Sequence, residues 1–154
     1  MRKPDVSLLA AENEIEGDNP SETKELLQLV EEAKNYLGSF RWCSGILESY
    51  CGIAAPGVFG VFLFGIEPAT DNVDDWLWVV VGDLPPAYIT AENANTPHEA
   101  LEGYIYEMKR WASAVEEGAS TEELIPVNVP PTKENASMLK SRLRLLEGYV
   151  QEEE

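Results

Sequence analysis

Basic residues are scarce in this chain of 154 residues. Its 11 lysines and arginines stand against 28 aspartates and glutamates, which gives a formal net charge of −17 at pH 7. Nucleic-acid binding depends on basic side chains that displace counterions from phosphates, and anionic membrane surfaces also attract basic segments. The composition therefore predicts no nucleic-acid and no membrane partner. It favours a basic protein as partner, because the negative field would accelerate the approach of such a protein. The alternative explanation is that the charge serves only to keep the protein soluble.

Cysteine, histidine and long apolar runs are also few. Cys43 and Cys51 have neither CxxC spacing nor the density of a disulfide scaffold, so we expect reduced, partly buried thiols. The longest apolar stretch, "GIAAPGVFGVFLFGI" (residues 52–66), contains a proline and is shorter than the roughly 18 residues that span a bilayer. The run "VSLLAA" behind Arg2 and Lys3 is too short for a signal sequence. These features predict a cytoplasmic protein.

Catalytic and cofactor motifs are missing too. No P-loop, GxGxxG, HExxH, GxSxG or zinc-binding pattern occurs in the sequence, so no cofactor and no metal is predicted. The stretch "DNVDD" (residues 71–75) lacks the spacing of a calcium loop and fits the tip of a hairpin instead. The bases Lys140, Arg142 and Arg144 do not form a phosphate site, and we interpret them as a solvated helix face with acids from elsewhere as partners.

Three helices are signalled by their ends. Asn19 and Thr96 are N-cap residues, each followed by proline, and the helices they begin end at Gly38 and Gly118. A third helix starts at Thr132. Apolar residues recur at spacings of three and four in all three, which predicts that each buries one face.

Two strands lie between the first two helices. Both are apolar on both sides: "VFGVFLFGI" (residues 58–66) and "WLWVVV" (76–81). This pattern is typical of strands that are covered on both faces of a sheet. Their connection is too short for a crossover helix, so they should form an antiparallel hairpin. "AYIT" (87–90) could add an edge strand. Trp76 and Trp78 are interpreted as core residues and not as a platform for stacking bases.

The remaining segments carry mixed signals. Residues 1–18 are expected to be a loosely ordered acidic lead-in. Residues 39–57 mix helical and extended signals, and we expect a short helix or an irregular segment over residues 46–50. The sequence as a whole predicts one α+β domain over residues 19–151, with a central antiparallel hairpin or small antiparallel sheet packed by three main helices.

Asp83, in "WLWVVVGDLPPAY" (residues 76–88), could be either a turn residue or a catalytic carboxylate. Glycine, aspartate and two prolines after a strand are typical of a turn. A carboxylate at a strand end could also be catalytic if it had a partner. Glu67 or Tyr88 would then be that partner.

Three stretches together carry a resemblance: "WLWVVVGDLPPAYI", "TPHEALEGYIYEMKRW" and "IPVNVPPTKENASMLKSRL". They resemble a set of small, acidic, mostly uncharacterised bacterial proteins over the C-terminal half of the chain. In size, acidity and lack of catalytic motifs, those proteins look like the single-domain immunity proteins that accompany bacterial toxins. The resemblance implies binding to a cognate toxin and carries over no functional residues.

Our leading hypothesis is a non-enzymatic acidic protein-binding module, plausibly an immunity protein that neutralises a toxin by direct binding. Its contact residues would be Asp71, Asp74, Asp75 and Trp42. The alternative is a small hydrolase or isomerase with a carboxylate-lined pocket between the hairpin and the second helix, using Asp83, Glu67 and Tyr88. The protein could be a monomer, or a homodimer whose final helix pairs with itself.

Overall fold

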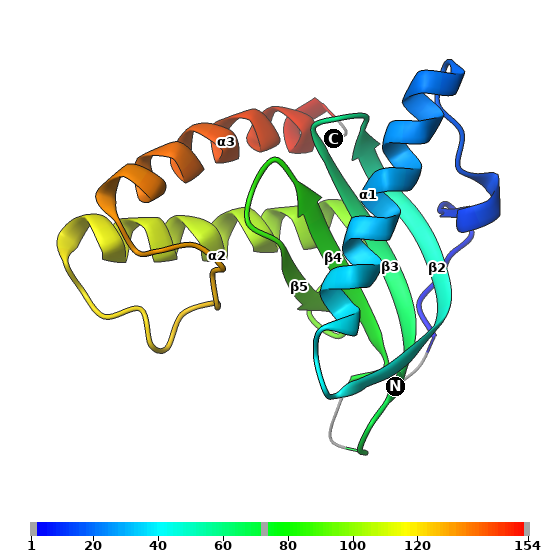
Figure 1. Ribbon diagram of the computed structural model, residues 1–154, viewed down its shortest axis with the longest axis horizontal. Helices are drawn as coiled ribbons and strands as arrows, with labels where there is room; N and C mark the ends of the chain where they lie inside the picture. Colours follow the sequence, from blue (N-terminus) through cyan, green and yellow to red (C-terminus); the bar gives the residue numbers. More distant parts are fainter. Residues whose placement is uncertain (1–2, 72–73, 153–154) are drawn as a thin grey trace.

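A single antiparallel sheet with helices on both faces forms the protein (Figure 1). The computed structural model describes residues 3–71 and 74–152, with the side chains of 3–71 and 74–150. The strands are hydrogen-bonded in the order β1-β2-β3-β4-β5, and each runs antiparallel to the next. The predicted single α+β domain is confirmed. The elements are β1 (Ala10–Ala11), a 3-10 turn η1 (Glu12–Glu14), α1 (Pro20–Gly38), β2 (Cys43–Ala55), β3 (Phe59–Pro68), β4 (Trp76–Gly82), β5 (Ala87–Thr90), α2 (Pro97–Glu117) and α3 (Lys133–Glu152).

β3 and β4 form the predicted hairpin at the centre of the sheet. Their side chains alternate between the two faces because successive residues of a strand point in opposite directions. One face packs against α2 and α3, and the other packs against α1. Trp76 and Trp78 belong to the α2 face and are buried, as predicted. β5 is the predicted edge strand beside β4.

Capping and apolar spacing place α1 and α2 as the sequence predicts. The Oδ1 atom of Asn19 accepts a hydrogen bond from the backbone N–H of Glu22 at 2.9 Å. The Oγ1 atom of Thr96 accepts one from Glu99 at 3.1 Å. α2 ends at Gly118, whose φ of +71° is the left-handed conformation that glycine tolerates. Each helix buries its apolar face, and for α1 these residues are Leu26, Leu29, Val30, Ala33 and Leu37.

α3 lies along α2 and completes the layer on that face of the sheet (Figure 1). Lys109 of α2 forms an ion pair with Glu147 of α3 at 2.5 Å, and Lys140 of α3 pairs with Glu116 of α2. The apolar face of α3 is buried within the same chain, through Ala136, Leu139, Leu143, Leu146 and Val150. In this fold, that face is therefore not available to pair with a second copy.

The prediction of a short helix or irregular segment over residues 46–50 is wrong, because these residues belong to the long strand β2. β2 pairs with β3 along its length, with register shifts between Cys43 and Gly45, between Ile46 and Glu48, and between Cys51 and Ile53. Each shift breaks the period of two by which a strand is recognised in a sequence. Gly45 and Gly52 lie at two of these irregularities.

The N-terminal segment also differs from expectation. The sequence predicts a loosely ordered lead-in over residues 1–18, whereas Ala10 and Ala11 form strand β1 and pair with Cys51 and Tyr50 of β2. Ile15 is buried against α1 residues. This part of the segment therefore belongs to the folded domain. Residues 1–2, and residues 72–73 within the predicted hairpin tip "DNVDD", lie outside the described residues.

Candidate partner-binding surface

Four aromatic side chains gather where α1 ends and β2 begins. α1 stops at Gly38, and a tight turn brings the chain back toward the sheet, with Phe40 N–H bonded to Leu37 O at 3.1 Å and Cys43 N–H to Phe40 O at 3.2 Å. This turn places Phe40 and Trp42 over the α1 face of the sheet, where Tyr88 of β5 and Tyr36 of α1 also lie. We call these four residues the aromatic cluster.

The rings of the aromatic cluster are in mutual contact. The ring centroid of Phe40 lies 4.7 Å from that of Trp42, with an angle of 21° between their planes. Tyr36 and Tyr88 meet Phe40 edge-on, at 5.1 and 5.6 Å. Trp42 and Tyr88 meet at 5.2 Å. Stacked and edge-on pairs at these distances are favourable beyond the area that they bury, so the cluster is a preformed, well-packed unit.

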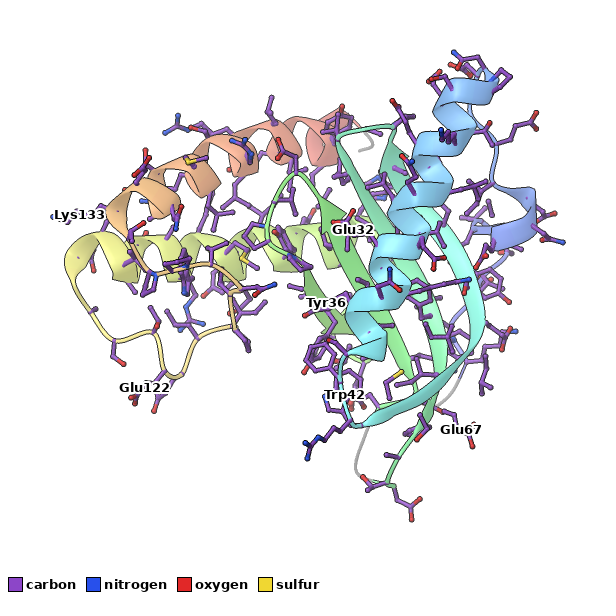
Figure 2. The ribbon with its side chains drawn as sticks, viewed as in Figure 1. Glu32, Tyr36, Trp42, Glu67, Glu122 and Lys133 are labelled. Atoms are coloured by element: carbon purple, nitrogen blue, oxygen red, sulfur yellow. The ribbon has the colours of Figure 1, made fainter. Side chains whose placement is uncertain are left out.

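The aromatic cluster is half-buried, and all four of its side chains keep part of their surface exposed. The hydroxyls of Tyr36 and Tyr88 and the indole N–H of Trp42 have no hydrogen-bond partner among the residues that the structure describes. Figure 2 shows Tyr36 and Trp42 at the lower end of α1, on the outside of the molecule. A partner could therefore cover the rings and bind these polar atoms.

Burial, and to a smaller extent the neighbouring Tyr88, raises the pKa of Tyr36 to about 12. The ordinary value is 10.0. The folded state therefore favours the neutral form of Tyr36. This preference stabilises the folded state fully below pH 10, and the stabilisation is lost as the pH rises from about 10 to about 12.

Tyr36→Phe should therefore reduce the alkaline loss of stability. Phenylalanine cannot ionise, so the variant should lose less free energy of unfolding than the wild type between pH 10 and pH 12. Urea unfolding at a series of pH values measures the difference. Equal losses in both proteins would show that Tyr36 ionises as readily in the folded state as in the unfolded state.

An acidic end of the sheet adjoins the aromatic cluster. The backbone carbonyl of Trp42 accepts a hydrogen bond from Ala69 N–H at 2.9 Å, which ties the start of β2 to the connection between β3 and β4. Glu67 and Asp71 in this region are exposed. Asp74 and Asp75 are half-buried just before β4. We call the aromatic cluster together with Glu67, Asp71 and Asp75 the aromatic–acidic surface.

Of the residues expected at a partner-binding site, Trp42 is tied through Ala69 to the connection that carries the three aspartates. Asp74 lines a separate hollow with Lys3 and Asn95. The structure adds Tyr36, Phe40 and Tyr88 to Trp42. The sequence named Tyr88 only as an alternative catalytic residue.

The alternative catalytic residues are separated. Phe59 pairs with Gly82 at one end of β3, next to Asp83, whereas Glu67 pairs with Gly45 at the other end. Eight residues of strand separate these ends, which corresponds to about 26 Å. Tyr88 pairs with Val79, away from both ends of β4. The three side chains therefore do not form one site.

Asp83 itself lies in a turn and forms an ion pair with a residue of α3. Its N–H is bonded to Val58 O at 3.0 Å, and its carboxylate lies 3.2 Å from the guanidinium of Arg142 on α3. Its side chain is 74% exposed, and such pairs contribute at most about 1 kcal/mol. The hollow of about 270 Å³ that Asp83 lines with Arg142 has no second carboxylate among its described lining residues.

The two cysteines are the remaining candidate nucleophiles. Burial raises the pKa of Cys51 to about 11 and also raises that of Cys43, so both are neutral thiols near pH 7 and are poor nucleophiles. Within the described residues, no three His, Cys, Asp or Glu side chains gather in a way that could hold a metal ion. Nor does any helix in the described part of the chain combine the length and apolar character needed to cross a membrane.

Comparisons with protein families, curated proteins and solved structures found no match to this chain. The aromatic–acidic surface is therefore interpreted from its own residues. Tyrosine, tryptophan and arginine are the side chains most enriched at the energetic centres of protein interfaces. The aromatic cluster contains the first two, and the exposed Arg41 stands between Phe40 and Trp42.

Proposed function

We propose that this protein binds a basic protein partner through the aromatic–acidic surface. The observation that carries the proposal is the half-buried aromatic cluster, whose four rings contact one another beside exposed acids. Packed aromatic anchors surrounded by a polar rim are the usual anatomy of a binding hot spot. The acids of the rim, Glu67 and Asp71, would speed the approach of a basic partner and exclude acidic ones.

The proposed partner is a toxin that the protein neutralises by direct binding, as an immunity protein does. The net charge of −17 supports a basic partner, because it would attract such a protein over several ångströms of solvent. The site residues support binding and not turnover, since the candidate catalytic side chains Asp83, Glu67 and Tyr88 lie apart. Binding alone would suffice to cover the active site of a toxin.

The test is co-expression with the product of the adjacent gene, followed by measurement of complex formation and of protection from toxicity. Trp42→Ala should weaken the complex by about a hundredfold, because truncating an interface tryptophan typically costs about 2–4 kcal/mol. Glu67→Gln with Asp71→Asn should mainly slow association and weaken its dependence on salt.

Leu145→Ala is the matched control for a lost exposed side chain. Leu145 is 63% exposed on α3, outside the aromatic–acidic surface, so its truncation should leave the affinity unchanged. A complex that tolerates Trp42→Ala as well as it tolerates Leu145→Ala would contradict the proposed surface. Absence of both complex and protection would contradict the proposed function.

A further inference from the structure

β5 is the last strand of the sheet and is paired on one side only. The N–H of Ala91 is bonded to Trp76 O at 3.0 Å, so residues 76 and 91 are a hydrogen-bonded pair. Hydrogen-bonded and non-bonded pairs alternate along an antiparallel ladder. Ile89 and Ala87 therefore direct their backbone groups toward β4, and Tyr88 and Thr90 direct theirs away from it.

The outward backbone groups of β5 are largely unused. The carbonyl of Thr90 accepts a hydrogen bond from Asn93 N–H at 3.0 Å. The N–H and C=O of Tyr88 and the N–H of Thr90 have no hydrogen-bond partner among the described residues. A row of unpaired donors and acceptors at a sheet edge is a template for another strand.

A hollow of about 350 Å³ lies against this edge, between β5 and α2. Its lining includes Ile89 and Thr90 of β5, Gly103 and Tyr106 of α2, and Ile125 of the connection between α2 and α3. Tyr106 is 62% exposed. The hollow therefore offers apolar and aromatic surface for the side chains of a chain that runs along the edge.

The charge beside the edge is negative. Glu99 and Glu107 line the hollow, and no lysine or arginine does so among the described residues. Arg110 is the nearest base on the same helix face. It lies 3.5 Å from Glu107, and its guanidinium lies over the ring of Tyr106 at 5.8 Å. The hollow thus complements a positively charged segment and repels a second copy of a chain with net charge −17.

We propose that an extended, lysine- or arginine-containing segment of the partner adds to the sheet at the free edge of β5. The inference rests on the proposed function, and it specifies how the basic partner is held. Tyr88 joins the two surfaces, because its side chain belongs to the aromatic cluster and its backbone lies on the free edge. A segment paired with Tyr88 and Thr90 would lead directly from the hollow to the aromatic–acidic surface.

The probe is a short synthetic peptide of alternating lysine and threonine, a composition that is basic and favours strands. Amide NMR of the full chain should show slower hydrogen exchange at Tyr88 and Thr90 when the peptide is added. The same peptide with all its backbone nitrogens methylated carries the same charge but cannot donate from either edge. It should bind about fivefold more weakly or worse, since the lost hydrogen bond to Tyr88 C=O costs about 1 kcal/mol. Equal binding of both peptides, or protection elsewhere only, would overturn the inference.

Thr90→Pro, compared with Thr90→Val, tests the same edge from the protein's side. Both substitutions remove the hydroxyl that accepts a hydrogen bond from Asn93. Proline alone removes the outward N–H, which makes no bond to β4, so the ladder of the sheet is kept. Thr90→Pro should weaken binding of the peptide about fivefold or more, and Thr90→Val should leave the binding unchanged. If the proline variant fails to fold, the comparison between the methylated and the unmethylated peptide still tests whether a strand is added at β5.

The outcomes separate this inference from the proposed function. Protection of Tyr88 and Thr90 that appears without peptide and grows with protein concentration would assign the edge to a second copy and overturn the inference. Failure of the peptide at β5, with a toxin complex that still depends on Trp42, would remove the strand addition alone. Success of the peptide, with no partner that depends on Trp42, would remove the proposed function alone.

Discussion

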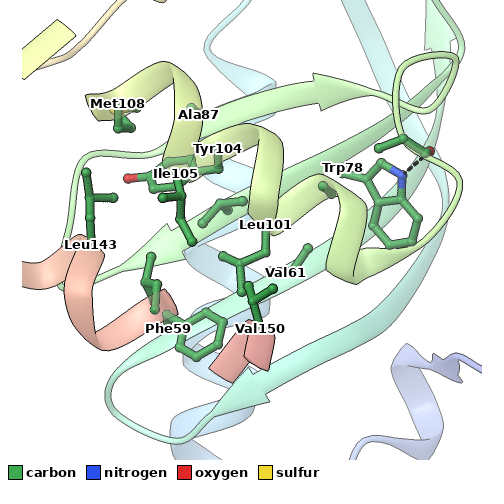
Figure 3. Packing of buried hydrophobic residues seen from close by; sticks show 14 of the residues in the cluster. Phe59, Val61, Trp78, Ala87, Leu101, Tyr104, Ile105, Met108, Leu143 and Val150 are labelled. Atoms are coloured by element: carbon green, nitrogen blue, oxygen red, sulfur yellow. Dashed lines mark hydrogen bonds between the residues drawn. The ribbon is translucent and has the colours of Figure 1, made fainter. Parts of the chain in front are cut away.

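Trp78→Ala should lower the free energy of unfolding by about 3–5 kcal/mol, the usual cost of truncating a buried tryptophan. The side chain is 1% exposed, on the α2 face of β4. Its indole N–H donates a hydrogen bond to Ala94 O at 2.9 Å, which Figure 3 shows beside α2. Alanine would leave a cavity in the core and a buried carbonyl without its donor. Urea denaturation followed by circular dichroism measures the change.

Trp42→Ala is the control of the same residue type. Trp42 is half-buried in the aromatic cluster and makes no hydrogen bond through its indole to a described residue, so its loss should destabilise the fold clearly less. Trp78→Phe should fall between the two, because it keeps most of the ring volume and loses the hydrogen bond to Ala94. Equal costs at Trp42 and Trp78 would contradict the division between a binding surface and a core.

Gly82→Ala should also destabilise the protein by about 3–5 kcal/mol. Gly82 has a φ of +140°, a conformation that residues with a Cβ rarely adopt. A Cβ there would lie 2.3 Å from Val58 O and 2.6 Å from Phe59 Cα. These are backbone atoms at the start of the neighbouring strand β3, and they cannot rotate away. The strand pairing and the turn that holds Asp83 would have to shift, and thermal or urea unfolding would report the loss.

Gly148→Ala is the same substitution at a position where we expect it to raise the free energy of unfolding. Gly148 lies within α3, and a Cβ there would have no atom within 4 Å. Alanine should stabilise the helix by about 1 kcal/mol, because glycine is the poorer helix former. A destabilising Gly148→Ala, or a neutral Gly82→Ala, would show that the backbone at these two positions differs from the structure.

The candidate site shows how far the sequence reaches. Trp42 stands next to Arg41 in a segment with mixed signals, which predicts an exposed aromatic residue. The aspartates cluster in a turn-rich connection, which predicts an exposed hairpin tip. Nothing local links them to Tyr36, Phe40 and Tyr88, which come from a helix, a turn and an edge strand. These rings meet because the turn after α1 brings Phe40 and Trp42 against Tyr88 of β5. The sequence also does not reveal that the alternative catalytic residues Asp83 and Glu67 are far apart, since only strand register shows that they lie at opposite ends.

By itself, the sequence determined the charge, the three helices and the central hairpin, because caps, turns and apolar periodicity act within a few residues of the chain. Two strands that are apolar on both sides required cover on both faces, so the layered arrangement followed as well. The tertiary structure alone decided that residues 43–55 form a strand and that Ala10 and Ala11 join it. Irregular pairing with a distant neighbour leaves no period in the sequence, and the proposed binding surface depends on that pairing.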